Sequence, residues 1–233
     1  MRKILFSIIT VFCLSFFFFL FTPDTYAVSF PADYDVTYTI GTDGVTQVRE
    51  NIVITNETDT QYPSQYTLAL EGVSIENIQA ADGAGVLETI VEDRDDFTLI
   101  TVNFNEIVIG RGNQLSWSLQ YQSADIVEKK GTITEVSLPQ IQPDERISSY
   151  RITVISPVEL GELDYSDPLP VSYERDESTR RLSYSFENPN EPISVLMAFG
   201  TTQLVDMELH YHLENTQHDR RLIEVALPPS QHS

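Results

Sequence analysis

The chain has 233 residues, with 35 acidic and 14 basic side chains and a formal net charge of −21 at pH 7. A surface this acidic repels nucleic acid and anionic lipid headgroups, which argues against both as partners. The single cysteine leaves no disulfide framework, so the fold must be stabilised by a hydrophobic core.

The chain opens with the three-part pattern of a secretory signal peptide. A basic start at residues 2–3 precedes an apolar run at residues 4–21. Thr25 and Ala27 then place small residues at the two positions that a signal peptidase recognises before its cleavage site. We therefore expect cleavage after Ala27 and an extracytoplasmic mature protein, secreted or associated with the cell envelope. Cleavage also removes Cys13, so the mature protein has no thiol. An uncleaved anchor is the alternative, because the apolar run is nearly long enough to span a bilayer.

Alternation of apolar and polar residues dominates from Tyr34 onward and predicts β-strands. Residues 34–40 and 48–54 flank a Gly-Thr-Asp-Gly turn, which predicts a hairpin. Further strands are expected at residues 66–70, 100–104, 115–121, 136–138, 150–154, 182–186 and 195–199.

Polar segments at residues 128–131 and 164–170 predict a turn and a loop between these strands. No segment has a sustained helical period with caps. The predicted fold class is all-β, an antiparallel β-sandwich whose sheets have one wet face, and Trp117 is expected in its core.

Two features bear on the domain organisation. Residues 28–200 are expected to form the sandwich, and a sub-boundary near residues 139–146, where two prolines interrupt the pattern, leaves one large or two smaller sandwiches open. Residues 201–233 predict the start of a second, truncated β module, because their pattern is similar to that of residues 52–70. An internal repeat and a chance likeness between two hairpins both fit this similarity.

No residue set predicts a catalytic centre, a cofactor site or a metal site. The carboxylates of the Asp-Arg-Asp-Asp cluster at residues 93–96, with Glu92 beside it, would ligate calcium if they converged with Asp82, but a solvated turn is the simpler interpretation. His210 and His212 share one strand face, as a zinc-binding pair would, yet no third ligand accompanies them. Asn56 begins an Asn-Glu-Thr glycosylation pattern. The chain has neither a serine nucleophile elbow nor a phosphate-binding glycine loop.

Several stretches share a pattern with a known group of proteins. They are Tyr34–Tyr38 running into Gly44–Thr46, Ile54–Asn56 with Gln65–Leu68, Gly112 leading to Leu115–Tyr121, and Ala198–Gly200 shortly before Leu209–Tyr211. These stretches resemble the N-terminal β-sandwich region of exported bacterial proteins that carry a transglutaminase-like domain further along. The resemblance implies an accessory region, whereas the catalytic Cys, His and Asp belong to the later domain. This chain has no mature cysteine, so no catalytic residue is carried over.

Together these patterns predict a non-catalytic, exported β-sandwich module of a cell-envelope protein, without a cofactor, that serves spacing, adhesion or partner binding. Its partner would be an envelope protein or a polysaccharide, and membrane contact would come only through the signal segment or a missing C-terminal part. One alternative is a carbohydrate-binding domain that aligns Tyr62, Tyr66, Tyr165 and Tyr173 on one sheet face. Another is a calcium-dependent adhesion domain built on Asp82 and residues 93–96.

Overall fold

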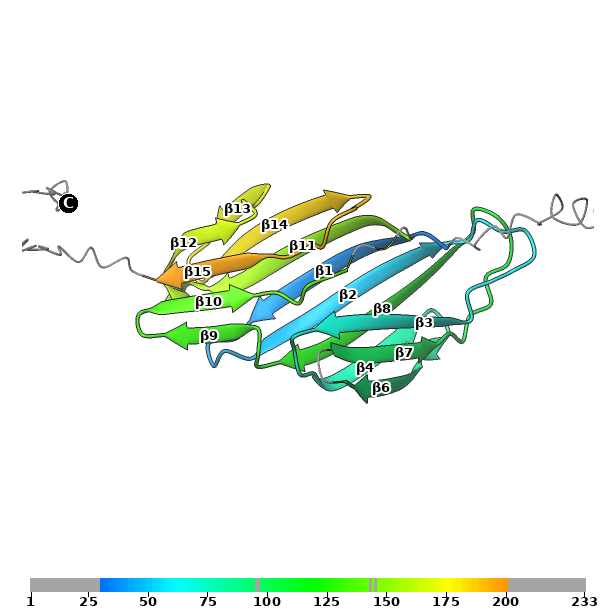
Figure 1. Cartoon of the computed structure of the whole chain (residues 1–233), viewed down its shortest axis with the longest axis horizontal. Coiled ribbons are helices and arrows are strands. Elements are labelled where there is room, and N and C mark those ends of the chain that lie inside the picture. Colours follow the sequence, from blue (N-terminus) through cyan, green and yellow to red (C-terminus); the bar gives the residue numbers. More distant parts are fainter. Residues whose placement is uncertain (1–29, 95–96, 143, 145, 201–233) are drawn as a thin grey trace, which may run out of the picture.

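The computed structural model describes residues 30–94, 97–142, 144 and 146–200. These residues fold into strands β1 to β15 and one 3₁₀ turn, η1 (Val158–Leu160). The strands form three sheets of eight, four and three strands, which confirms the predicted all-β, sandwich-like fold (Figure 1). None of the described residues belongs to a helix long and apolar enough to span a membrane.

The eight-stranded sheet is the larger layer, and the first strand of the chain lies inside it. Strand β1 pairs in parallel with β11 on one side and antiparallel with β2 on the other. The sheet therefore combines strands from before and after residues 139–146. Its order is β13 (Ser172–Arg175), β14 (Thr179–Glu187), β11 (Ile147–Pro157), β1 (Ala32–Ile40), β2 (Thr46–Thr55), β8 (Gln114–Ser123), β4 (Glu76–Asp82) and β5 (Gly85–Val86).

The two smaller sheets form the second layer. One has the order β12 (Glu162–Asp167), β15 (Leu196–Gly200), β10 (Ile133–Ser137) and β9 (Val127–Lys130), and the other β3 (Gln65–Glu71), β7 (Phe97–Asn103) and β6 (Glu88–Asp93). Both lie on the same face of the large sheet (Figure 1). The Tyr66 ring of β3 lies 5.6 Å from the Trp117 ring of β8, and the Ser166 hydroxyl of β12 lies 2.9 Å from the Tyr184 hydroxyl of β14. The opposite face of the large sheet is covered by no described element.

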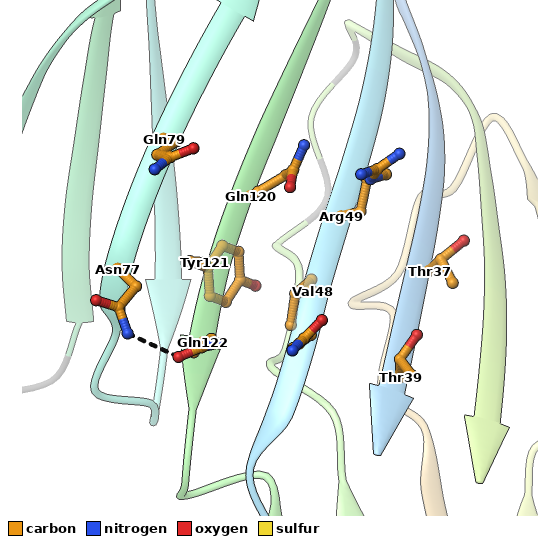
Figure 2. A pocket seen from close by; sticks show the side chains of 10 residues that line it. Thr37, Thr39, Val48, Arg49, Asn77, Gln79, Gln120, Tyr121 and Gln122 are labelled. Atoms are coloured by element: carbon orange, nitrogen blue, oxygen red, sulfur yellow. Dashed lines mark hydrogen bonds between the residues drawn. The ribbon is translucent and has the colours of Figure 1, made fainter. Parts of the chain in front are cut away.

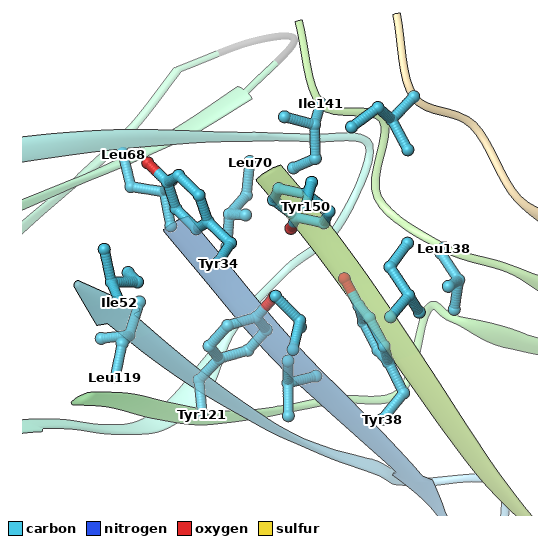
Figure 3. Packing of buried hydrophobic residues seen from close by; sticks show 14 of the residues in the cluster. Tyr34, Tyr38, Ile52, Leu68, Leu70, Leu119, Tyr121, Leu138, Ile141 and Tyr150 are labelled. Atoms are coloured by element: carbon cyan, nitrogen blue, oxygen red, sulfur yellow. The ribbon is translucent and has the colours of Figure 1, made fainter. Parts of the chain in front are cut away.

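The core lies between these layers and follows the alternation of the sequence. Inward positions of the central strands carry apolar or aromatic side chains, which Figure 3 shows packed around Tyr34, Tyr38, Tyr121 and Tyr150. Trp117 is only 4% exposed, which confirms the prediction that it is a core residue. Burial of such side chains is the main favourable contribution to folding.

Two short strands lie where the sequence predicts a turn and a loop. Residues 127–130 form β9, so the turn begins at Gly131, and residues 162–167 form β12. Both are edge strands of the four-stranded sheet, and most of their residues are exposed. An edge strand whose two faces are both exposed to solvent is held by backbone hydrogen bonds along one edge. It needs no alternation of apolar and polar residues, so its sequence lacks the pattern that predicts a strand.

Candidate functional site

A row of outward-facing polar side chains crosses the uncovered face of the large sheet. Successive strand registers place these residues side by side from β4 to β13. On β4, β8, β2, β1, β11 and β14 their sequence neighbours point towards the core, because successive side chains of a strand alternate between faces, whereas the edge strand β13 is exposed along its whole length. We call this set the Arg49 row, after its one charged member: Gln79, Gln120, Arg49, Thr37, Thr153, Ser183 and Ser172.

A shallow hollow of about 570 Å³ lies over one half of the Arg49 row, on β4, β8, β2 and β1. Figure 2 shows its amide, hydroxyl and guanidinium groups projecting from these strands. The Asn77 amide donates a hydrogen bond of 2.7 Å to the Gln122 side-chain oxygen at its edge. The lining contains no acidic residue, although the chain has 35: Thr37, Thr39, Gln47, Val48, Arg49, Asn77, Gln79, Gln120, Tyr121 and Gln122.

Arg49 also differs from most other arginines of the described chain in having no carboxylate partner. Six arginines lie within 4.0 Å of a carboxylate oxygen: Arg94, Arg111, Arg146, Arg151, Arg175 and Arg180. Within the described ranges Arg49 and Arg181 have no such ion pair, and both lie on the open face. Arg181 still stands opposite Glu174 in the strand register, whereas Arg49 stands between Gln120 and Thr37. The five N–H donors of Arg49 are therefore available to solvent or a ligand.

Beneath the hollow, the next residue along β2 is a buried acid. Glu50 is 1% exposed, and within the described part of the chain neither of its carboxylate oxygens has a hydrogen-bond partner. Burial raises the pKa of Glu50 to about 7, and the Tyr121 hydroxyl, although outside hydrogen-bond geometry, acts in the opposite direction. Glu50 is not among the residues predicted as functional, although an acid at an inward position of the alternation is a signal that the sequence contains.

The four tyrosines expected on one carbohydrate-binding face do not come together. Tyr66 belongs to the core, where its hydroxyl is hydrogen-bonded to that of Tyr34 and its ring lies against Trp117. Tyr165 lies on β12 and Tyr173 on β13, two strands of different sheets. Tyr62 lies in the connection between β2 and β3 and is 40% exposed.

The acidic residues considered for calcium are also separated. The Asp82 carboxylate accepts hydrogen bonds from the backbone N–H groups of Ala84, Gly85, Asn105 and Glu106, at 2.8 to 3.1 Å. These bonds place Asp82 next to the end of β7, whereas Asp93 pairs with Thr98 near its start. About five residue steps of roughly 3.3 Å separate the two ends. Residues 95–96 lie outside the described residues. Among those described, no group of three or more His, Cys, Asp and Glu side chains could hold a metal ion.

The remaining sequence candidates divide into one buried residue and several that the structure does not describe. Asn56 is 1% exposed, and its amide nitrogen donates to the backbone oxygens of Gln61 at 2.6 Å and Val108 at 2.9 Å. This nitrogen, which would carry a glycan, is thus engaged inside the fold. The signal-peptide site at Ala27 and the pair His210 and His212 lie outside the described residues.

No protein-family model and no curated protein sequence matches the chain. Among solved structures, one similar chain is an M1 zinc metallopeptidase from Deinococcus radiodurans, with a TM-score of 0.44, 10% identity, and coverage of 73% of this chain and 42% of the peptidase. Another is a putative nutrient binding protein from Legionella pneumophila, with a TM-score of 0.45, 10% identity, and coverage of 74% of this chain and 68% of that protein. This chain thus spans less than half of the peptidase. Similarity at this level assigns no activity.

Proposed function

We propose that this chain is a non-catalytic binding module of an exported cell-envelope protein, and that it binds its partner through the open face of the eight-stranded sheet. The observation that carries this proposal is the Arg49 row with its hollow. An acid-free strip of hydrogen-bonding side chains is unexpected on a molecule with a net charge of −21. Such a strip leaves Arg49 without a carboxylate partner unless a ligand supplies one.

The chemistry of this face favours binding over catalysis. Amides, aliphatic hydroxyls and a guanidinium group keep their protonation states near neutral pH, so they are poor general acids and bases. They are well suited to donating and accepting hydrogen bonds. The face therefore serves recognition of a polar partner.

The finer part of the proposal is that the module is the N-terminal accessory region of a transglutaminase-like envelope protein. The signal-peptide pattern and the stretches that resemble this group support it. The test is the reading frame of the intact gene beyond Ser233. A downstream domain with a Cys-His-Asp set supports the proposal, whereas a stop codon or an unrelated domain contradicts it.

Binding of the mature chain, residues 28–233, to isolated cell envelopes of the source organism tests the main proposal. Thr37→Glu and Gln120→Glu each place a carboxylate in the Arg49 row, and we expect either to weaken binding at least tenfold. Thr67→Glu is the matched control, because Thr67 is exposed on β3 in the other layer. Thermal melts confirm that each variant is folded. Wild-type binding by both row variants would rule out this face as the binding surface.

A further inference from the structure

We infer that the ligand of the open face is a polysaccharide that lies along the Arg49 row, across the strands, and presents the carboxylate of a uronic-acid sugar to Arg49. This inference rests on the proposed function, since it names the partner of the same face. It follows from the direction of the row, the chemistry of its side chains and the lack of an ion pair at Arg49.

The row offers a polar side chain at every strand that it crosses. Neighbouring strands lie about 4.8 Å apart, so the hydrogen-bonding groups recur at intervals comparable to the length of one pyranose ring. An extended sugar chain laid across the strands therefore meets a new polar group with nearly every residue. Gln79, Gln120 and Arg49 supply long side chains at the hollow, and Thr37 supplies a short one (Figure 2).

The type of side chain favours a sugar over a peptide. A primary amide both donates and accepts, as sugar hydroxyls do, so Gln79 and Gln120 can each engage neighbouring hydroxyls. A peptide strand would instead add to a sheet edge, because backbone groups in the middle of the face already pair within the ladders between strands. The Arg49 row includes no aromatic ring on which a sugar could stack. The ligand is therefore held through hydrogen bonds to its hydroxyl and carboxylate groups.

The charge pattern favours a polysaccharide that carries a carboxylate on some of its sugars but not on every one. The guanidinium group of Arg49 matches a carboxylate through two parallel hydrogen bonds. The nearest outward acid along β1 is Asp35, whose carboxylate lies 4.0 Å from Arg151 instead. A net charge of −21 repels a polymer that is charged at every unit. A chain in which uronic acids alternate with neutral sugars carries the required charge at lower repulsion.

Titration calorimetry of the mature chain with defined oligosaccharides tests the inference. The carboxylated probes are octasaccharides of hyaluronan and of unsulfated chondroitin, in both of which glucuronate alternates with a neutral N-acetylated sugar. Chitohexaose and cellohexaose are the neutral probes. We expect at least one carboxylated probe to bind, and at least tenfold more tightly than either neutral probe.

Variants then locate the contact. Arg49→Gln should reduce the affinity for the carboxylated probe to that for the neutral ones, and Arg49→Lys should retain part of the preference. Arg111→Gln is the control, because Arg111 is an exposed arginine paired with Asp59 at 3.5 Å, outside the open face.

The inference is overturned if no carboxylated probe binds, if neutral probes bind equally well, or if Arg49→Gln leaves the preference intact. These failures differ from a failure of the proposed function. If the row variants still lose binding to cell envelopes while no carboxylated probe binds, the open face is the binding surface and the ligand class is wrong. If the row variants bind envelopes normally, the binding surface itself is wrong.

Discussion

Glu50 occupies the inward position between Val48 and Ile52 on β2, where the alternation otherwise places apolar side chains. In the folded protein burial raises its pKa to about 7 from an ordinary value of 4.5. The folded state therefore binds this proton more tightly than the unfolded state does. The contribution of Glu50 to the free energy of unfolding is therefore highest below about pH 4.5. It falls as the pH rises towards 7 and stays low above that value.

Glu50→Gln should remove this pH dependence, because the amide has nearly the same shape and no charge to bury. We expect the wild-type protein to lose on the order of 3 kcal/mol of this contribution between pH 4.5 and pH 8, and the variant to lose much less. Urea unfolding across this range measures the difference between the two proteins. Glu92→Gln, an exposed substitution, is the control. Parallel pH profiles for wild type and Glu50→Gln would contradict the assignment.

Asp82 is a second carboxylate with a structural role, but its pKa is shifted downward. Desolvation acts to raise its pKa, but four backbone N–H groups together favour the ionised form and lower the pKa from 3.8. Its contribution to stability is therefore present above about pH 3.8 and is lost as the pH falls further. The same bonds hold the turn after β4 to residues 105–106.

Asp82→Asn should loosen this turn without unfolding the protein, since an amide oxygen accepts these bonds more weakly than a carboxylate. Hydrogen exchange at Asn105 and Glu106 should accelerate severalfold. The equivalent change Asp43→Asn, which affects one backbone hydrogen bond at Val45, serves as the control.

Calcium should not stabilise the protein at Asp82. Because both Asp82 carboxylate oxygens already accept hydrogen bonds, millimolar calcium should leave the melting temperature unchanged. A clear rise with calcium would support the calcium-dependent alternative.

At the scale of elements, the sequence alternation predicted the faces of the strands but not their neighbours. A two-residue period places Val36 inward and Thr37 outward whichever strand lies beside them. The two-residue period gives no information about which strands pair with each other, so it could not predict the parallel pairing of β1 with β11. The predicted antiparallel β-sandwich is confirmed as the fold class, and β1 with β11 is the one parallel pair among the described strands.

The same limit applies to the candidate site. Five members of the Arg49 row lie at polar positions of predicted strands, whereas Gln79 and Ser172 lie outside them, and the row exists only through the registers from β4 to β13. Glu50 could have been predicted from the sequence, because an acid at an inward position departs from the pattern. The four tyrosines illustrate the reverse error, since aromatic type alone does not say whether a ring such as Tyr66 lies in the core.

The end of η1 packs closely against the end of β15. A methyl group on Gly161 would lie 2.6 Å from the Gly200 Cα atom, and Gly161 has a φ of +98°. Gly161→Ala should therefore destabilise the protein by about 2 kcal/mol or more, since a clash adds to the backbone strain. Gly131→Ala is the matched control, because Gly131 has a φ of +66° with open space around it. We expect it to cost about 1 kcal/mol. Equal losses in urea unfolding would show that the close approach does not matter.

At the scale of the whole molecule, the excess of acidic residues should oppose folding through self-repulsion. Salt screens this repulsion, whereas the exposed ion pairs that it also weakens contribute little. We expect the melting temperature at pH 7.5 to rise by several degrees between low salt and physiological salt. The rise should vanish near pH 4.3, the sequence pI. A fall with salt at pH 7.5 would mean that the ion pairs outweigh the repulsion.

The position of β1 inside the large sheet also affects how the protein is made. Synthesis proceeds from the N-terminus, so β1 and β2 are complete well before β11, which ends at Pro157. Until then one edge of β1 offers unpaired backbone groups beside apolar side chains such as Val36 and Tyr38. Such an edge can capture another strand, and pairing across so long a separation is slow. Production of this protein should therefore depend on a chaperone that shields the nascent β1 edge until the last residues of β11 have emerged.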